Sequence, residues 1–300
     1  MPVKKIFILL IVFCHCKLAP AQADSLPEKS PRGYLVAGTA LSFTGGFYLL
    51  YQSWYKAYAV GSFRFFDDSR EWKGMDKIGH VASASILFDQ FADIAGYSGY
   101  AKRQANLYAL GSSMAFLTAI ECMDGFSDGW GFSVADYAAN VAGSTFSFLR
   151  RSGAGRNWPM LKYSWKPGNL STLRPELLGR SVAERMLKNY NEQTYWLSFP
   201  LNMIFPRTPR WLCIATGYTA DGMLGARTNS WTSEAGILYD YGYIERYASF
   251  KLSLDIDLLA LPLKKKWQRK LVGIVRWIKI PAPGIEIRTG KNHGVSTFLW

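Results

Sequence analysis

Three apolar segments of the chain each carry a group of polar residues at the spacing of one helical turn. In chain order the groups are Asp76, Lys77 and His80, then Glu121 and Asp124, then Asp136 and Asn140. Residues three or four positions apart lie on the same face of a helix. Because burying a polar group without a partner is costly, we expect the three groups to point toward one another.

An imidazole among carboxylates is suited to two kinds of chemistry. His80 could act as a general base, with Glu121, Asp124 and Asp136 as acid partners whose pKa values differ. Alternatively, a divalent metal could be bound through oxygen and nitrogen ligands by Asp76, His80, Glu121 and Asp124. The residues therefore define a candidate catalytic set and a candidate metal set that overlap.

The same groups could instead be structural. Lys77, Asp128 and Asn140 would then complete a hydrogen-bonded network that fixes the register of the helices, with His80 satisfied by a carboxylate. A site for a lipid headgroup is the third alternative. The sequence leaves open whether the protein is an enzyme.

Several other catalytic patterns are absent from the sequence. It contains no Gly-x-Ser-x-Gly elbow, no glycine-rich phosphate loop and no His-Glu-x-x-His motif. His80 and His293 are the only histidines after residue 23, which excludes a metal site built from several histidines. Cys122 and Cys213 are the only cysteines in the same part, and their spacing requires neither a disulfide nor a zinc site.

Four charge-poor segments are predicted to form the helices that carry the polar groups: 33–55, 78–95, 104–124 and 133–149. The first has 23 residues without Asp, Glu, Lys or Arg, so it is long enough to span a membrane or to lie buried. Basic residues do not favour one end of the segments. We therefore predict a helical bundle docked on a membrane or partly sunk in it, rather than a protein with four spans.

The second half of the chain is predicted to be rich in strands. A basic linker and a helix starting at Pro175 occupy 151–192. The β-branched and aromatic segments expected to form strands are 194–199, 210–218, 234–241, 246–258, 272–280, 284–288 and 295–300. Apolar and polar residues alternate in 246–258, which predicts one apolar face and one wet face.

These patterns predict an α+β fold. An N-terminal bundle of about four membrane-associated helices covers 24–150, and an antiparallel β-rich region covers 193–300. The aromatic end of the chain, Phe298 to Trp300, also fits a small outer-membrane β-barrel as an alternative form of the second half. A sheet packed against the helices is the interpretation we favour.

The first 23 residues have the pattern of a secretory signal peptide. Lys4 and Lys5 precede an apolar run at 6–13, and a small-x-small pattern ends at Ala23. The run is too short to span a bilayer comfortably. We therefore expect an exported protein of the periplasm or the outer membrane.

The net charge differs strongly between the two halves. Residues 24–149 hold 9 Lys and Arg against 12 Asp and Glu, a net charge of −3, whereas 150–300 hold 23 against 10, a net charge of +13. For an exported protein with 15% aromatic residues, we expect the basic half to contact anionic lipid or an envelope protein rather than nucleic acid. The run 264–270 mixes cations with a tryptophan, which fits either headgroup contact or a solvated loop.

The polar motifs resemble a known bacterial family. The groups from Asp76 to His80, from Glu121 to Ser127, from Trp130 to Asp136 and from Asn140 to Gly143 are similar to a family of predicted periplasmic lipoproteins, domain of unknown function 2279. The stretch 190–198 resembles the long form of that family in Gram-negative bacteria. A more distant likeness links the polar motifs to VanZ-like membrane proteins. The chain departs from the lipoprotein pattern because neither Cys14 nor Cys16 follows a small residue.

The resemblance implies a location in the cell envelope and a helical core near the membrane, with no established reaction. We predict an exported envelope protein that is structural or that binds lipid or a partner at a membrane. The alternative is a metal-dependent or acid/base enzyme that acts on an envelope lipid or glycan through His80 and the neighbouring carboxylates.

Overall fold

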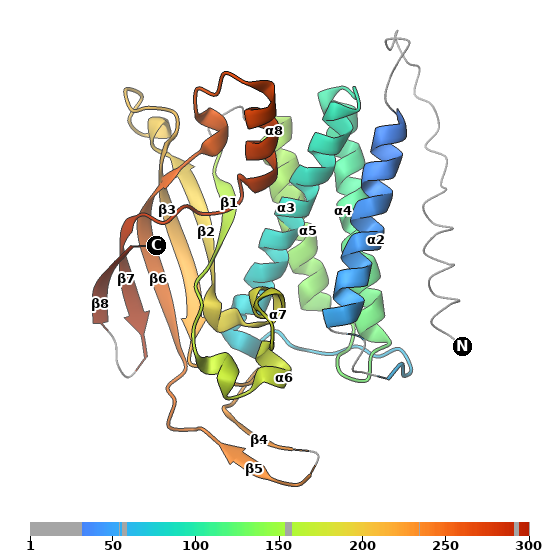
Figure 1. The fold of residues 1–300 in the computed structure, drawn as a ribbon, viewed down its shortest axis with the longest axis vertical. Coiled ribbons are helices and arrows are strands. Elements are labelled where there is room, and N and C mark those ends of the chain that lie inside the picture. The colour runs from blue at the N-terminus through green and yellow to red at the C-terminus, as the bar shows by residue number, and fades with distance from the viewer. Residues whose placement is uncertain are drawn as a thin grey trace.

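The chain forms a group of helices followed by an antiparallel sheet, and Figure 1 shows the two side by side. The computed structural model describes residues 32–53, 55, 59–153, 158–233, 235–290 and 294–299. The expected signal peptide at 1–23, His293 and Trp300 lie outside the described residues.

Four long helices make up the first half. They are α2 (Arg32–Ser53), α3 (Met75–Tyr97), α4 (Lys102–Gly125) and α5 (Val134–Ser152), with the short 3-10 helix η2 (Glu71–Gly74) ahead of α3. The predicted helical first half is therefore confirmed. Within the described residues, no helix combines the length and the apolar character needed to cross a membrane.

The helices pack through aromatic and small side chains. The rings of Phe43 and Phe116 lie 5.1 Å apart in an edge-on arrangement, and Phe47 packs beside them. At the contact between α3 and α5, a Cβ on Gly143 would come within 2.1 Å of the carbonyl oxygen of Val81. Only glycine allows the two helices to approach this closely, and this approach brings their polar residues together.

A six-stranded antiparallel sheet occupies the second half. Its strand order is β1-β2-β3-β6-β7-β8, and the bounds are β1 (Met160–Trp165), β2 (Gln193–Pro200), β3 (Leu212–Asp221), β6 (Tyr247–Ile256), β7 (Pro283–Thr289) and β8 (Gly294–Leu299). The strands β4 (Ser230–Thr232) and β5 (Leu238–Asp240) form a separate pair. The predicted antiparallel, C-terminal sheet is confirmed.

Short helices connect parts of the second half. The described residues hold seven α-helices in all, whereas about four were expected in the first half and one from Pro175. The helices beyond the four long ones are α6 (Pro175–Leu178), α7 (Val182–Lys188) and α8 (Lys266–Val275). The 3-10 helices in this half are η4 (Leu170–Thr172), η5 (Tyr190–Glu192), η6 (Leu201–Met203) and η7 (Leu258–Ala260). The single helix predicted from Pro175 is divided at Gly179, whose φ is 100°.

Two segment predictions were wrong. The segment 272–280 is not a strand: α8 covers its first residues, and its later part pairs with the sheet backbone through an isolated bridge between Tyr163 and Ile278. The expected linker contains β1, which pairs with β2. The physical reason for the first error is that Trp267, Leu271 and Ile274 follow helical spacing although their neighbours are β-branched.

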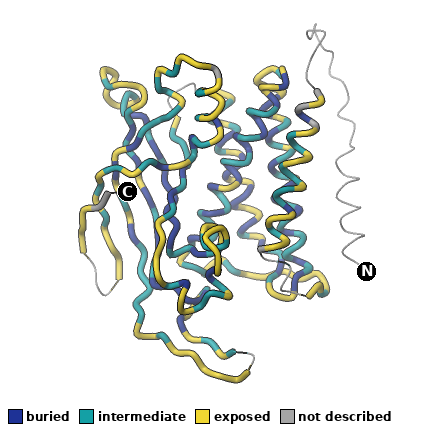
Figure 2. The backbone as a smooth tube through the Cα atoms, viewed as in Figure 1, coloured by how far each residue is buried: buried dark blue, intermediate teal, exposed yellow. Residues whose placement is uncertain are grey.

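The alternation in β6 is as predicted, but its burial is inverted. Phe250 and Leu254 are 54% and 48% exposed, whereas Ser249 and Asp255 on the opposite face are 0% and 1% exposed. Ala248 of β6 pairs with Ala220 of β3, and Ala220 packs in a cluster with Met75 and Ala82 of α3. The apolar side chains of β6 therefore lie on the same sheet face as α3. The helices thus cover only part of this apolar face (Figure 2).

The polar face of the sheet is buried around an ion pair. The Lys162 ammonium lies 2.6 Å from Asp255 Oδ2, and both side chains are at most 1% exposed. The Ser198 hydroxyl donates to the same carboxylate at 2.5 Å, and the Lys279 ammonium lies 3.9 Å from its other oxygen. Cys213 on this face and Cys122 on α4 are both free thiols.

Two arginines, Arg276 and Arg227, connect the second half to the helices through ion pairs. The buried Arg276, just after α8, lies 2.8 Å from Asp93 Oδ2 near the end of α3. Arg227 lies 3.2 Å from Glu71 Oε1 in η2, ahead of α3. The second half therefore holds α3 near both of its ends.

Candidate functional site

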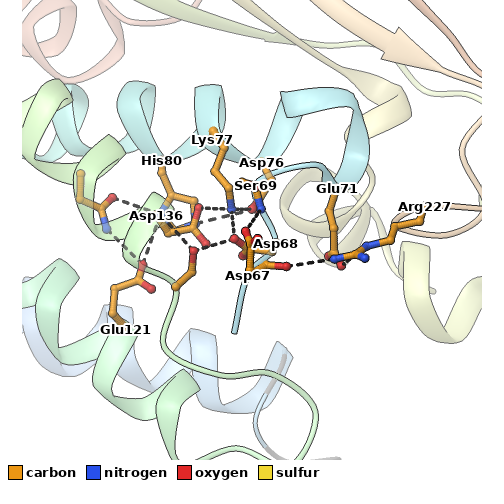
Figure 3. A network of polar contacts seen from close by, with 12 residues as sticks. Asp67, Asp68, Ser69, Glu71, Asp76, Lys77, His80, Glu121, Asp136 and Arg227 are labelled. Atoms are coloured by element: carbon orange, nitrogen blue, oxygen red, sulfur yellow. Dashed lines mark hydrogen bonds and ion pairs between the residues drawn. The ribbon is translucent and has the colours of Figure 1, made fainter. Parts of the chain in front are cut away.

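The polar groups of α3, α4 and α5 meet at one end of the helices. Figure 3 shows side chains from the beginning of α3, the end of α4 and the beginning of α5 pointing toward one another. Ser133 caps α5, because its hydroxyl accepts a hydrogen bond from the Asp136 amide at 3.1 Å. The cap fixes the first turn of α5 and so places Asp136 and Asn140 in the cluster.

The Lys77 ammonium occupies the centre of a group of carboxylates. It lies 2.5 Å from Asp68 Oδ1, 2.7 Å from Asp76 Oδ2 and 2.6 Å from Asp136 Oδ1. Burial alone would lower the pKa of Lys77, but the three carboxylates outweigh it and raise the pKa above its usual value. Lys77 therefore stays charged and supplies the positive charge that the carboxylates require.

His80 lies beside this group and makes contacts through both ring nitrogens. Its Nδ1 is 3.1 Å from Asn140 Oδ1 and 3.5 Å from Glu121 Oε1. The Asn140 amide donates to the same Glu121 oxygen at 3.1 Å, so its own oxygen faces His80 as an acceptor. This arrangement assigns a proton to Nδ1.

The other ring nitrogen faces two carboxylates. His80 Nε2 lies 3.8 Å from Asp76 Oδ1 and 3.6 Å from Asp136 Oδ1. A lone pair facing two carboxylate oxygens is unfavourable, so a proton has to lie on Nε2 or on one of the acids. The His80 side chain is 25% exposed, so the imidazole is partly open to solvent.

The acids of the cluster differ in their pKa values. Burial raises the pKa of Glu121 to about 8, and burial together with the charge of Asp76 raises the pKa of Asp136 to about 8. Burial also acts on Asp76, but the charges of His80 and Lys77 outweigh it and hold its pKa below the usual value. Acids that titrate this far apart can hold and release a proton near neutral pH.

The structure brings most of the predicted site residues together. The ligand atoms of Asp76, His80 and Asp136 lie within 4.8 Å of one another and form a group that could hold a metal ion. Two of the predicted residues make contacts other than those with Lys77 and His80. Asp124 accepts a hydrogen bond from Tyr55 at 2.7 Å, and Asp128 lies in the loop after α4, where a Cβ on Gly61 would be 2.1 Å from its Oδ1. The catalytic, metal-binding and structural roles stay predictions.

Three participants were missing from the sequence interpretation. Asp68 binds Lys77, Ser133 donates to Asp68 Oδ1 at 2.6 Å, and Tyr190 donates to Asp76 Oδ1 at 2.5 Å. Tyr190 belongs to η5 in the second half, so no helical spacing could have placed it here. The sequence feature that could have identified Asp68 is the pair of adjacent acids, Asp67 and Asp68, ahead of α3.

A second surface lies near the other end of α3. The helix α8 exposes Trp267, Leu271 and Ile274 by 60%, 52% and 58%, and their spacing places them on one side of the helix. Exposed cations surround this apolar side; they are Lys264, Lys265, Arg269 and Lys270. Such a helix, with apolar and basic residues both facing solvent, is typical of contact with a lipid interface.

The connection between β2 and β3 extends this surface. It exposes Met203, Ile204 and Phe205, followed by the exposed Arg207 and Arg210. A backbone hydrogen bond of 2.8 Å from Asp257 to Trp211 joins it to the segment that leads to α8. Figure 1 shows this connection and α8 at the same end of the molecule, and we call the two together, 203–211 and 264–274, the basic end surface.

The basic end surface and the polar cluster are separate. Gln90 of α3 donates to the carbonyl of Ile274 in α8 at 3.4 Å, whereas His80 lies ten residues earlier in the same helix. At 1.5 Å per residue this separation is about 15 Å along the helix axis. A molecule bound at one surface would not touch the other directly.

Residues 64–152 match the model of a protein family described as Predicted periplasmic lipoprotein (DUF2279). The match runs from the segment ahead of α3 to the end of α5, so it includes the polar cluster except Tyr190 and leaves the sheet outside. That description supports an exported, periplasmic location. Comparisons with curated proteins and with solved structures found no match. The more distant likeness to VanZ-like membrane proteins stays a prediction.

Proposed function

We propose that this is an exported cell-envelope protein that binds the surface of an anionic membrane through its basic end surface. The observation that carries the proposal is the outward apolar side of α8 with its flanking cations. Trp267 would sit at the level of the headgroups, and Lys264 and Lys265 would contact their phosphates. The family description of residues 64–152 supports the periplasmic location that this requires.

The chemistry of the surface favours lipid as its occupant. Tryptophan combined with lysine and arginine matches the boundary between acyl chains and phosphates, where one part of the contact is apolar and the other is charged. The ring of Tyr97, at the end of α3, lies 5.6 Å from the Lys270 ammonium and adds a further amphipathic side chain. The second half also carries the positive net charge of the chain, +13 over 150–300.

Binding to vesicles should depend on lipid charge, on salt and on these residues. We expect the protein to sediment with phosphatidylglycerol vesicles at low salt, and to be released as salt screens the charges. Each lysine near an anionic surface contributes about 1 kcal/mol, so the double variant Lys264→Glu, Lys265→Glu should bind at least about 25-fold more weakly. Trp267→Ala should weaken binding at every salt concentration.

A matched double variant controls for net charge. Arg70 and Arg180 are exposed and lie outside the basic end surface, so Arg70→Glu, Arg180→Glu changes the total charge equally. We expect this control to bind vesicles as the unmodified protein does. Equal binding of both double variants, or binding indifferent to lipid charge and salt, would remove the basis of the proposal.

The polar cluster supports a second candidate function, an acid/base centre acting on an envelope lipid or glycan. The specific observation is the partly exposed His80 between acids whose pKa values lie near 8. His80 Nε2 would take a proton, with Asp136 as the neighbouring acid and Lys77 holding the carboxylates in place. A metal-dependent form would require a cation close to the Lys77 ammonium, which repels it.

Purified protein separates these alternatives from a structural network. We expect His80→Gln to abolish release of headgroup or acyl chain from phospholipid vesicles while the melting temperature changes little. Glu121→Gln should lower the rate and shift its pH profile. If no product forms, elemental analysis finds no metal and both variants only lower the melting temperature, the cluster is structural.

A further inference from the structure

A polar cavity of about 270 Å³ lies between the buried polar face of the sheet and the loop after β1. Its walls come from the 166–170 loop, from η5 and from the strands β2, β3, β6 and β7. It belongs neither to the polar cluster nor to the basic end surface. Because the walls are mostly polar or charged, water or a polar ligand fills such a space better than an acyl chain does.

Two buried side chains of the wall have an atom without a hydrogen-bond partner among the described residues. Asn189 is 0% exposed and its Nδ2 is an unpaired donor, and Glu192 is 3% exposed and its Oε2 is an unpaired acceptor. The other oxygen of Glu192 is held by Arg185 and by the Gly168 amide at 3.1 Å. Both atoms are closed to solvent and to the cavity, so a ligand contacts the charged side chains of the wall rather than these two atoms.

The charges of the wall balance. Its three basic and three acidic side chains are Lys166, Lys251 and Arg288, and Glu192, Asp221 and Glu286. Arg288 and Glu286 lie 3.5 Å apart, so charges of both signs are fixed next to each other. A ligand with one charge of each sign can pair with both sets, and charge-assisted hydrogen bonds are about twice as strong as neutral ones.

We propose that this cavity binds a small zwitterion, a molecule with an ammonium and a carboxylate, of the size of an amino acid. The ammonium pairs with the acidic side chains of the wall, and the carboxylate accepts from its basic side chains. A neutral sugar, whose hydroxyls donate and accept, is the competing ligand class. The inference does not depend on the proposed membrane binding or on the acid/base centre.

Calorimetric titration of the full-length protein distinguishes the ligand classes. We expect L-alanine to bind. N-acetyl-L-alanine lacks the ammonium and L-alaninamide lacks the carboxylate, so both should bind at least about tenfold more weakly than L-alanine. Glucose should not bind. Binding of glucose in place of alanine, binding of either blocked analogue as tightly as alanine, or no binding of any probe would overturn the proposal.

A charge reversal at the mouth assigns the binding to this cavity. Lys166 is exposed, so Lys166→Glu should keep the melting temperature of the free protein and weaken alanine binding about tenfold. The exposed Arg180 does not line the cavity, and Arg180→Glu serves as the matched control. If the two variants bind alanine equally, the ligand lies elsewhere and the assignment is wrong.

Discussion

Replacing Asp255 by leucine is expected to lower the free energy of unfolding by about 3–5 kcal/mol, as breaking a buried ion pair does. The change leaves the ammonium of Lys162 buried without its carboxylate, and Lys279 loses the same neighbour. Burial already lowers the pKa of Lys279 to about 8, so this side chain can lose its proton, whereas Lys162 is held 2.6 Å from the carboxylate. Urea unfolding followed by circular dichroism measures the loss.

A double variant tests whether the charge is the cause. Lys162→Met with Asp255→Leu removes both charges, so it should recover most of the stability that Asp255→Leu loses. Arg227→Met is the control, because its pair with Glu71 is exposed on the arginine side and should contribute at most about 1 kcal/mol. A double variant as unstable as Asp255→Leu alone would show that shape, and not charge, decides the stability of this face.

Lys77→Met is the second large effect, with an expected loss of up to about 3 kcal/mol at neutral pH. Asp136 already has a raised pKa beside the ammonium, and without the ammonium the carboxylates of Asp68 and Asp76 also lose their positive neighbour. Their pKa values in the folded variant then rise above those in the unfolded chain. Stability from groups of this kind is present at low pH and is lost as the pH rises.

The pH dependence gives the sign of the effect. In the unmodified protein Lys77 helps to lower the pKa values of Asp68 and Asp76, so the stability that these acids contribute is present above about pH 4 and is lost as the pH falls. The difference between the two proteins should therefore be largest at neutral pH and should vanish well below pH 4. Unfolding free energies across this range check it, with the exposed Arg70→Met as control. A difference that is independent of pH would contradict the carboxylate group described here.

The sequence allowed the polar cluster to be predicted because its information is local. Each of α3, α4 and α5 repeats polar residues every three or four positions, and the cost of burying them indicates that they face one another. The position of Lys77 among three carboxylates was not predictable in this way. It depends on Asp68, which precedes α3, and on how closely Gly143 lets α5 approach Val81.

The inverted sheet shows what a strand pattern cannot decide. Alternation in 246–258 fixed which residues share a face, but not which face is buried. Lys162 and Asp255 neutralise each other on the buried polar face, and this pair joins strands far apart in the sequence. The strand β1 was not predicted, because the Gly and Pro residues around it indicated a linker. The helix α8 was not predicted, because its β-branched residues favour strands.

The contacts between the second half and α3 bear on how the molecule unfolds. Tyr190 bonds the first turn of α3, Arg227 bonds the segment just before it, and Arg276 bonds Asp93 near its end. Unfolding of the second half would therefore remove partners from both ends of α3 at once. The helices and the sheet should unfold in a single cooperative step, so a destabilising substitution in either half should lower the stability of the whole molecule.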